Sequence, residues 1–315
     1  MTQPGLDPAK SDIGILVVTY NSGQEIGSCL DAAIRSGVEI VVVDNASSDR
    51  TIAEVTRRDV KFISNLTNRG FAGAVNQGFI VLKKPYVLLL NPDAILQSDL
   101  GPLREACELP GAAGAGGRLL DPDGRPQIGF MARQLPTAVT LALEALLLNR
   151  VCPNNPVNRR YRGLGLNYET RFQVEQPAGA FVMIRRAVWE ELGGFDEGFH
   201  PLWFEDVDFC RRAVSCGHQW YYEPRAVAKH TGAHSISSLT VEMRRFYWYR
   251  SLLKYSVKHF RPRAFRGVCL AVAAGSVLRM IAETVVERRF KPIAVNGRVV
   301  RLASRCFWSA GEAMR

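Results

Sequence analysis

Three carboxylates lie within four residues of the sequence, at Glu205, Asp206 and Asp208. Like charges held this close raise one another's pKa, and a carboxylate with a raised pKa can act as a general base near neutral pH. The same pattern is typical of an acidic first turn of a helix, in which Asp208 would pair with Arg211 or Arg212. We favour the helical explanation for Asp208 and general-base chemistry for Asp206.

Polar residues also follow several apolar runs of the sequence. Two of these polar residues, Asp44 and Arg69, could bind a nucleotide. Ligands of open α/β sheets bind at the carboxyl ends of the strands, so residues just after a strand are candidates. Asp44 could accept hydrogen bonds from a nucleobase or a ribose, or it could cap the next helix. Arg69 precedes a glycine-rich stretch at 70–78 and suits a diphosphate, although by itself this pattern is more typical of a surface arginine.

Metal chemistry is indicated at two further positions. Asp93 follows the apolar LLLNP segment, where it could hold Mg²⁺ or Mn²⁺ against substrate phosphates or lie in a Pro-Asp turn. His230 and His234 lie in the segment KHTGAHS and could bind a metal or be polar loop residues.

The elements that must position these residues alternate between strands and helices. Four short apolar runs predict strands, and helix-like stretches separate them, which indicates an α/β fold with a doubly wound, mostly parallel sheet. The expected strands are 13–19, 39–43, 60–64 and 86–90, and the helices are 25–36, 49–58 and 70–82.

The rest of the first 243 residues is less regular. The DPDG sequence at 121–124 predicts a hairpin within 111–129, and 130–172 is placed only loosely, with a helix at LALEALLL. Further strands are expected at 180–186, 218–223 and 226–230, and helices at 187–192 and 204–217.

Composition excludes several classes of protein. The chain has 315 residues, of which 47% are hydrophobic and 22% charged, so it is neither disordered nor a small stapled scaffold. Its seven cysteines include no CxxC pair, which indicates a reducing compartment. The first twelve residues lack the basic start and apolar stretch of a secretion signal, so we expect a cytoplasmic protein.

The net charge of +10 is concentrated at one end of the chain. Residues 244–315 carry 16 Lys and Arg against 3 Asp and Glu, a net charge of +13, whereas residues 1–243 carry −3. Helices are expected at 239–260 and 263–290, and the apolar run 267–278 is shorter than the roughly 20 residues that span a bilayer. A basic helix with such a run indicates peripheral association with an anionic membrane, and a packed core helix is the alternative. Interleaved aromatics could instead indicate nucleic-acid binding, but the acidic cluster argues against it, and no nucleic-acid partner is expected.

Taken together, eight segments occur in the order and spacing of glycosyltransferase family 2. They are VVTYNS, VVVDNASSDRT, NRGFAGAVNQG, LLLNPDA, GRLLDPDGRPQ, PAGAFVMIRR, GGFDEGFHPLWFEDVDFCRR and KHTGAHS. The chain resembles the bacterial rhamnosyltransferase-like branch of this family over about residues 13–240. The resemblance implies a GT-A fold and an inverting transfer of a sugar from a nucleoside diphosphate donor, with a divalent cation, Mg²⁺ or Mn²⁺, on the diphosphate.

The resemblance also implies roles for single residues. Asp206 matches the catalytic base and Glu205 would position the acceptor or the base. The usual Asp-x-Asp metal motif appears as Asn91-Pro92-Asp93, so Asp93 would be the main metal ligand, and His230 resembles a histidine that completes the metal site in some relatives. Implied donor-binding residues are Thr19, Tyr20, Asn21, Asp44, Asn68, Arg69, Gly70, Asn76 and Asn91, and implied acceptor-binding residues are Trp203 and Phe204.

These expectations give a domain plan and a function. Residues 1–243 would form the catalytic domain, with a donor-binding half at about 13–130 and an acceptor half at about 131–243, and residues 244–315 a basic helical extension. The expected reaction moves a sugar, best guessed as L-rhamnose from dTDP-L-rhamnose, to a lipid-linked or polysaccharide acceptor at the inner face of the plasma membrane. Another donor such as a UDP-hexose stays open. A sugar nucleotidyltransferase is less favoured, because the glycine-rich phosphate loop with a lysine is missing near the amino terminus.

Overall fold

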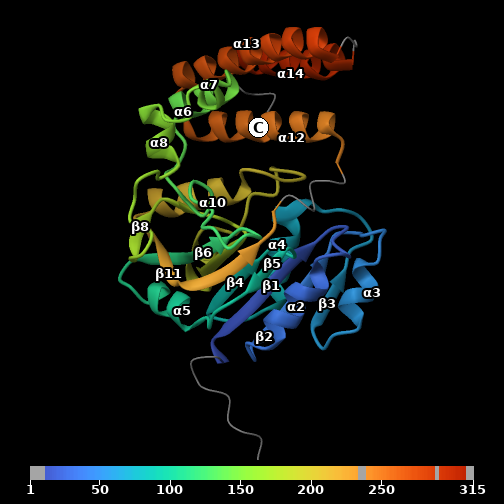
Figure 1. The fold of residues 1–315 in the computed structure, drawn as a ribbon, viewed down its shortest axis with the longest axis vertical. Helices are drawn as coiled ribbons and strands as arrows, with labels where there is room; N and C mark the ends of the chain where they lie inside the picture. The colour runs from blue at the N-terminus through green and yellow to red at the C-terminus, as the bar shows by residue number, and fades with distance from the viewer. Residues whose placement is uncertain (1–10, 233–238, 288–290, 310–315) are drawn as a thin grey trace, which may run out of the picture. The chain divides into compact units, whose positions relative to one another are not determined.

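The computed structural model describes residues 11–232, 239–287 and 291–309, and these form two compact units (Figure 1). Unit 1 comprises residues 11–134, 165–201 and 205–232, and unit 2 comprises 135–164, 202–204 and the described residues from 239 onward. Unit 2 therefore includes three stretches, 135–164, 202–204 and 239–243, that the expected boundary at 243 assigns to the catalytic domain. His234 lies outside the described residues.

The amino-terminal half of unit 1 is a parallel sheet, as the sequence predicts. Four strands lie in the order β3-β2-β1-β4 and are all parallel to their neighbours. Their apolar residues are buried, as expected of strands covered on both faces. The strands are β1 (Ile13–Thr19), β2 (Glu39–Asp44), β3 (Lys61–Ser64) and β4 (Tyr86–Leu90).

The second half of the sheet is mixed rather than parallel. β10 (Phe181–Arg185) lies antiparallel between β4 and β6 (Ala112–Leu120), and β11 (Gln219–His230) pairs parallel with β6. β5 (Ala94–Leu96) and β8 (Phe172–Val174) pair antiparallel with β11. The sheet of unit 1 is thus mixed, and its parallel half carries the strand ends singled out above.

Two local features connect these strands. β6 contains the sequence AAGAGG, and a side chain at Gly114 would lie 2.7 Å from the ring of Trp220, so the small residues admit large neighbours on β10 and β11. After β6, the backbone N–H of Gln127 donates to the carbonyl of Leu119 at 2.9 Å and joins the two arms of the predicted hairpin around the DPDG turn. The two strands expected at 218–223 and 226–230 are one strand, β11, with a register shift at Pro224, which cannot donate to the ladder.

Helices pack on the sheet of unit 1. The first three of the helices given below fall within the stretches that the sequence predicts, and α10 begins at the acidic cluster. α5 packs against β6, β11 and β10. β7 (Ala132–Arg133) and β9 (Gln176–Pro177) form a separate two-stranded antiparallel sheet. The helices are α2 (Ile26–Ile34), α3 (Thr51–Thr56), α4 (Gly70–Val81), α5 (Gly101–Cys107), α9 (Arg186–Glu191) and α10 (Glu205–Ser215).

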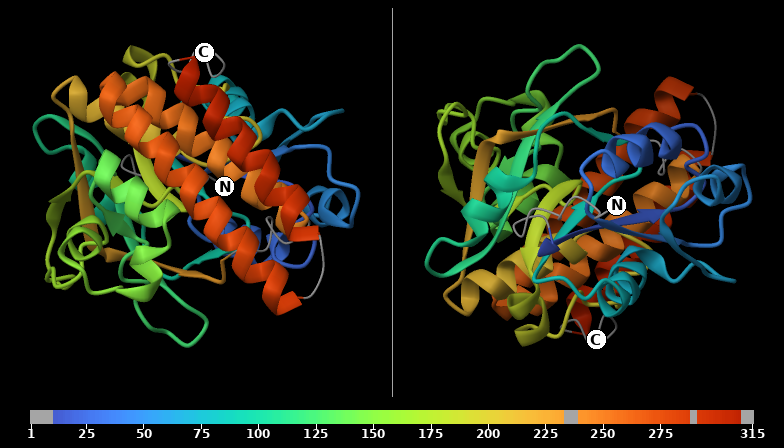
Figure 2. Two further views of the ribbon diagram at one scale, coloured as in Figure 1. Left: turned by 90° about the horizontal axis from the view of Figure 1, so that it is seen from above. Right: turned by 90° about the horizontal axis from the view of Figure 1, so that it is seen from below.

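Unit 2 is helical, and two long helices, α13 and α14, lie side by side in it (Figure 2). α6 packs against α13, where a side chain at Gly275 would collide with the carbonyl of Ala145. This close approach explains why the segment from 135 to 164 belongs to unit 2. The helices are α6 (Ala138–Ala145), α7 (Leu148–Val151), α8 (Pro156–Tyr161), α12 (Val241–His259), α13 (Pro262–Glu287) and α14 (Lys291–Trp308), of which α8 and α14 are not predicted from the sequence.

By length and composition alone, α13 could cross a membrane. Its 24-residue segment Pro262–Val285 contains a window of mean hydropathy 1.7, and 33% of that window is buried within the protein. Within the described residues it is the one helix that meets this criterion. The helix therefore extends well beyond the twelve apolar residues on which the sequence expectation rests.

Candidate active site

Asp93 and His230 are far apart in the chain and adjacent in unit 1. β5 pairs antiparallel with β11, and this register sets Ala94 opposite His230. Asp93 directly precedes β5, so its Oδ1 lies 3.5 Å from Nε2 of His230. Both side chains are 6% exposed. The sheet thus joins the two residues to which the resemblance assigns metal ligation.

Gln127 holds the ring of His230 in one orientation. The side-chain amide of Gln127 donates to the backbone carbonyl of His230 at 2.8 Å, which leaves its Oε1 to accept from Nδ1 of the ring at 3.0 Å. With the proton on Nδ1, the lone pair of Nε2 faces Asp93. Burial lowers the pKa of His230, and the Asp93 carboxylate offsets part of that effect. A neutral imidazole beside a carboxylate fits a divalent cation, and Gln127 acts as the outer partner that such histidines usually have.

An aromatic and cationic stack extends from His230. Phe130 lies parallel to the imidazole, with ring centroids 5.4 Å apart and an angle of 5° between the planes. The guanidinium of Arg133 lies 5.3 Å from the centroid of the Phe130 ring, and its Nε donates to the carbonyl of Gly129 at 2.8 Å. The positive charge of Arg133 in turn lowers the pKa of Asp206. Phe130 and Arg133 therefore link His230 to Asp206 through a ring stack, a cation–π contact and the charge of the guanidinium.

Glu205 and Asp206 begin α10. The Oδ1 of Asp206 accepts from the backbone N–H of Val207 at 2.8 Å, and a side chain at Gly179 would lie 3.1 Å from its Oδ2. A side chain at 179 would therefore crowd the carboxylate and require it to shift. Glu205 is 6% exposed, and its Oε2 is buried without a hydrogen-bond partner.

Both carboxylates of this pair bind protons more strongly than usual. Desolvation raises the pKa of Asp206, partly offset by the N–H of Val207, Arg133 and the N–H of Gly179. Burial raises the pKa of Glu205 further, and repulsion by Asp206 adds to it. A carboxylate with a raised pKa is a stronger base, which is what the deprotonation of an acceptor hydroxyl requires.

Asp208 has a structural role, as the sequence predicts. It is fully buried, and its Oδ2 accepts from Nε of Arg212 at 2.8 Å. Arg212 also donates to the carbonyls of Leu192 and Gly194, so this ion pair fixes α10 to the loop that precedes it.

The expected nucleoside residues gather at the ends of β1 and β2. Thr19 and Asp44 are register partners and both are buried, with the Oγ1 of Thr19 lacking a hydrogen-bond partner. Asp44 accepts from the N–H and the hydroxyl of Ser47. Asn21 has φ 50°, and its Oδ1 accepts from the N–H of Ser48 at 2.8 Å. Tyr20, between Thr19 and Asn21 in the sequence, is half-buried.

Asn45 connects this group to the start of α4, a role that the sequence interpretation missed. Its Nδ2 donates to the carbonyl of Gly70 at 3.0 Å, and its Oδ1 lies 3.4 Å from the N–H of Arg69. Asn68 accepts from the N–H of Gly70 at 2.8 Å, and Gly70 has φ 77°. The amide of Gly70 is therefore already used, whereas the side chain of Arg69 is exposed.

The remaining candidate residues are not joined to these groups by the contacts described above. Asn76 donates to the carbonyl of Phe195 and to Glu197, and it accepts from the N–H of Phe195, so both ends of its amide hold the 195–197 loop. Asn91 is half-buried after β4. Trp203 and Phe204 belong to unit 2 and have φ values of 76° and 70°.

Gln127, Phe130 and Arg133 are further residues of the site that the sequence does not predict. Gln127 was part of a motif quoted for its family resemblance, GRLLDPDGRPQ, but no chemistry pointed to it. Phe130 and Arg133 follow in a segment with no periodic pattern, so only the tertiary structure reveals them.

Comparisons with known proteins give matches over most of the chain. The family model described as "Glycosyl transferase family 2" matches residues 14–193, and the model "Glycosyltransferase like family 2" matches residues 158–251. The N-acetylglucosaminyl-diphospho-decaprenol L-rhamnosyltransferase of Mycobacterium tuberculosis is 29% identical over 243 residues, which cover 70% of this chain and 76% of that protein. The O-antigen chain rhamnosyltransferase RfbN of Salmonella typhimurium is 26% identical over 230 residues, which cover 70% of this chain and 66% of that protein.

Solved structures show the same fold. GalNAc-T7, crystallised with UDP, GalNAc and Mn²⁺, matches with a TM-score of 0.55 and 14% identity. The match covers 79% of this chain and 48% of that one, so this chain corresponds to about half of that protein. The predicted GT-A fold with a helical carboxyl-terminal region is confirmed.

Proposed function

The chain belongs to glycosyl transferase family 2, and from that premise we propose that it moves a sugar from a nucleoside diphosphate donor to an acceptor hydroxyl with inversion. The relatives named above are rhamnosyltransferases, which supports L-rhamnose from dTDP-L-rhamnose as the donor. One of them bears the name of a diphospho-decaprenol acceptor, which supports a lipid-linked acceptor in cell-envelope glycan synthesis. A UDP-hexose donor and a polysaccharide acceptor are the alternatives.

The observation that supports this proposal is the presence of two residue pairs in unit 1, linked through Phe130 and Arg133. Asp206 and Glu205 form a carboxylate pair of raised proton affinity, and Asp93 and His230 form a buried ligand pair. Phe130 and Arg133 connect the pairs, as described above. An inverting transfer needs both functions, because the acceptor is deprotonated on the face opposite the departing diphosphate.

In this mechanism Asp206 accepts the proton of the acceptor hydroxyl as the hydroxyl oxygen attacks the anomeric carbon. The bond from that carbon to the diphosphate oxygen breaks with its electron pair left on the diphosphate. Glu205 lies beside the proposed base in the chain, and repulsion by Asp206 adds to the rise in the pKa of Glu205 that burial causes. A divalent cation, when bound by Asp93 and His230, would neutralise the charge that develops on the leaving diphosphate.

Donor binding is assigned to the ends of β1 and β2 and to the start of α4. The free Oγ1 of Thr19 and the carboxylate of Asp44 can meet a nucleoside, with Tyr20 and Asn21 beside them. Arg69, together with Asn68, Gly70, Asn76 and Asn91, stays a prediction for the diphosphate and sugar. Arg69 is the one whose charge suits a diphosphate.

We further assign the protein to the cytoplasmic face of the membrane as a peripheral enzyme. The charge of +13 in residues 244–315 would attract anionic lipid, where each basic residue near the surface contributes about 1 kcal/mol. Binding to anionic vesicles that weakens as salt is raised would support this assignment.

A thermal-shift screen tests the function. dTDP-, UDP- and GDP-sugars are added with Mg²⁺ or Mn²⁺, and the preferred donor is expected to raise the melting temperature according to its affinity. Asp93→Asn should remove the part of the shift that depends on the cation, and the exposed Asp59→Asn should not. Equal, negligible shifts for all three donor classes would contradict the proposal. Release of nucleoside diphosphate rather than pyrophosphate separates it from a nucleotidyltransferase.

A further inference from the structure

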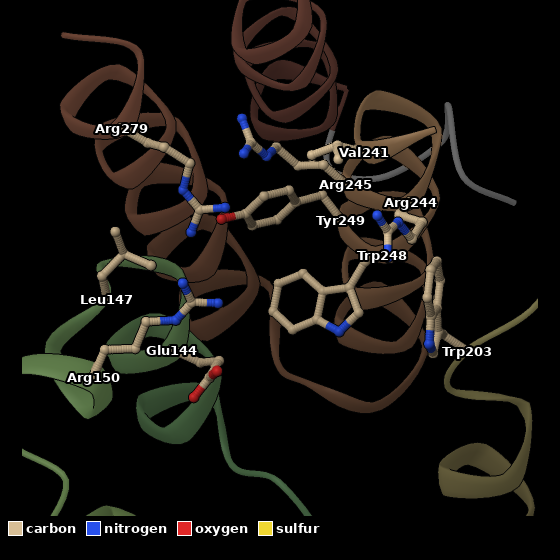
Figure 3. Close-up of a pocket in the computed structure, with 10 residues that line it drawn as sticks. All are labelled: Glu144, Leu147, Arg150, Trp203, Val241, Arg244, Arg245, Trp248, Tyr249 and Arg279. Atoms are coloured by element: carbon tan, nitrogen blue, oxygen red, sulfur yellow. The ribbon is translucent and has the colours of Figure 1, made fainter. Parts of the chain in front are cut away.

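Unit 2 contains a cavity that the proposed chemistry does not use (Figure 3). Its volume is about 370 Å³, and ten residues from α6, α7, α12, α13 and the segment 202–204 line it. Four of them are arginines and three are aromatic: Arg150, Arg244, Arg245, Arg279, Trp203, Trp248 and Tyr249. In Figure 3 the guanidinium groups of Arg150 and Arg279 and the hydroxyl of Tyr249 point toward one another.

The positive charge of this cavity is not balanced by the protein. Arg245 is paired with Glu283 through bonds of 2.7 and 2.8 Å, but in the described part of the chain Arg150, Arg244 and Arg279 form no ion pair. Glu144 is the one acidic residue in the lining, and it accepts from Asn149 at 2.9 Å.

The arginines therefore repel one another. Burial lowers the pKa of Arg279, and the positive charges of Arg245 and Arg150 lower it further. Tyr249 and Glu283 act in the opposite direction but do not restore the usual pKa. Arginine cannot escape such repulsion by losing its proton, because its pKa stays far above neutrality. An anion that enters the cavity would relieve it, and arginine forks match phosphate oxygens in pairs.

The outer face of α13 indicates where that anion comes from. Arg279 faces the cavity, whereas an exposed apolar stripe on the same helix has no partner among the described residues; it consists of Leu270, Val277, Leu278, Ile281 and Val285. A helix in a membrane interface sinks its apolar face about 5–10 Å into the lipid. Since a helix is about 10–12 Å across, its opposite face then lies near the level of the lipid phosphates.

We propose that this cavity binds the diphosphate of an isoprenoid-linked acceptor, a proposal that rests on the function proposed above. Arg150, Arg244 and Arg279 bind the two phosphates. The stripe on α13 lies in the membrane that holds the isoprenoid chain. Trp203 and Trp248 offer flat faces against the first sugar of the acceptor.

The chain itself limits how far this cavity can be from the base. Trp203 lines the cavity and precedes Asp206 by three residues, so their Cα atoms are at most about 11 Å apart, however the two units are arranged. The segment is anchored in unit 2, because the hydroxyl of Ser251 donates to the carbonyl of Leu202 at 3.0 Å and Phe204 packs on Tyr255. The chain therefore keeps Trp203, at the wall of the cavity, within this distance of Asp206.

Vesicle binding by the full-length protein tests the proposal. Phosphatidylcholine vesicles carry geranylgeranyl diphosphate, or phosphatidylglycerol at matched charge, and binding is measured by co-sedimentation. We expect the protein to bind the geranylgeranyl diphosphate vesicles at least tenfold more tightly than the phosphatidylglycerol vesicles. Arg150→Gln with Arg279→Gln should abolish that preference, whereas Arg301→Gln, an exposed arginine on α14 outside the cavity, should leave it within twofold.

Three outcomes would overturn the proposal. They are equal binding to the two kinds of vesicle, equal loss in the Arg301→Gln control, and displacement from the vesicles by dTDP as effective as by geranylgeranyl diphosphate. The single variant Arg150→Gln, at an exposed position, guards against misfolding of the double variant and should retain an intermediate preference. Nucleotide-sugar binding by thermal shift is measured on the same samples. If the wild-type protein does not bind a nucleotide sugar, the proposed function is contradicted. If the double variant still binds it but no longer prefers the diphosphate vesicles, the cavity proposal is tested separately from the proposed function.

Discussion

The two charged sites of this protein, the carboxylates of unit 1 and the arginines of unit 2, answer electrostatic repulsion in different ways. Glu205 and Asp206 can take up a proton, and their raised pKa values show that they do so readily. Arg150 and Arg279 cannot release theirs at any physiological pH. Burial of the acids therefore favours the proposed base, whereas repulsion among the arginines favours the proposed anion site.

Burial differs as well. Glu205 is 6% exposed and has an unpaired oxygen, whereas Arg150 is exposed and Arg279 is half-buried. A buried carboxyl group gains proton affinity chiefly from desolvation, and a guanidinium at a cavity wall keeps its hydration on one side. The acidic site should therefore be sensitive to pH, and the basic site to salt and to anions.

The largest expected effect comes from removing the base. Asp206→Asn should lower turnover by about 10²- to 10⁴-fold, because the amide cannot accept the acceptor proton. Release of nucleoside diphosphate in the presence of acceptor measures this. Asp59→Asn, at an exposed position, is the control and should stay within twofold. Full turnover by Asp206→Asn would remove the acidic site from the comparison.

A smaller loss is expected when the outer partner of His230 is removed. Gln127→Ala frees the ring that Gln127 holds, and Mn²⁺ affinity should fall about 10- to 100-fold. Titration of Mn²⁺ in the presence of a nucleoside diphosphate gives the affinity. Gln97→Ala, at an exposed position near the end of β5, provides the control. An unchanged affinity would mean that the ring needs no support.

Arg133→Gln should change the pH profile more than the maximal rate. Arg133 lowers the pKa of Asp206, so its removal should move the acidic limb of kcat/KM to higher pH. Well above that limb the base is deprotonated in both proteins, and the loss should be small. A loss that is the same at every pH would instead assign Arg133 to substrate binding.

The smallest effect concerns stability. The folded pKa of Glu205 lies above its unfolded value, so its contribution to the free energy of unfolding is full at low pH and is lost as pH rises through the folded pKa. Glu205→Gln should therefore weaken the fall in stability between acidic and neutral pH, by about 1.4 kcal/mol for each unit of pKa shift. Urea unfolding at several pH values measures this. A pH dependence equal to that of the wild type would show that Glu205 is not the group responsible.

The sequence predicted the parallel half of the sheet because each of its strands is a self-contained apolar run followed by a helix. It did not predict β5, whose three residues are too few for a pattern, nor the antiparallel insertion of β10. It also missed α14, which contains Pro292, Asn296 and Gly297 and so has weak helix propensity.

The same limit applies to the sites. Asp93, His230 and Asp206 were singled out because their motifs are local, and the structure brings the first two together. Arg133 and the arginine cavity could not be found in this way, since they depend on contacts between distant segments. The packing of α6 on α13, which unites Arg150 with Arg279, is one such contact.

The pairing of β5 with β11 has a consequence for the order of folding. Residues 97–218 lie between the two strands in the chain, and contacts of such long range form late because closing the intervening loop costs entropy. Asp93 is therefore synthesised long before its partner His230, and a nascent or partly folded chain lacks the pair. Cation affinity would then appear only when the last edge of the sheet has closed, so that metal binding reports the completion of folding.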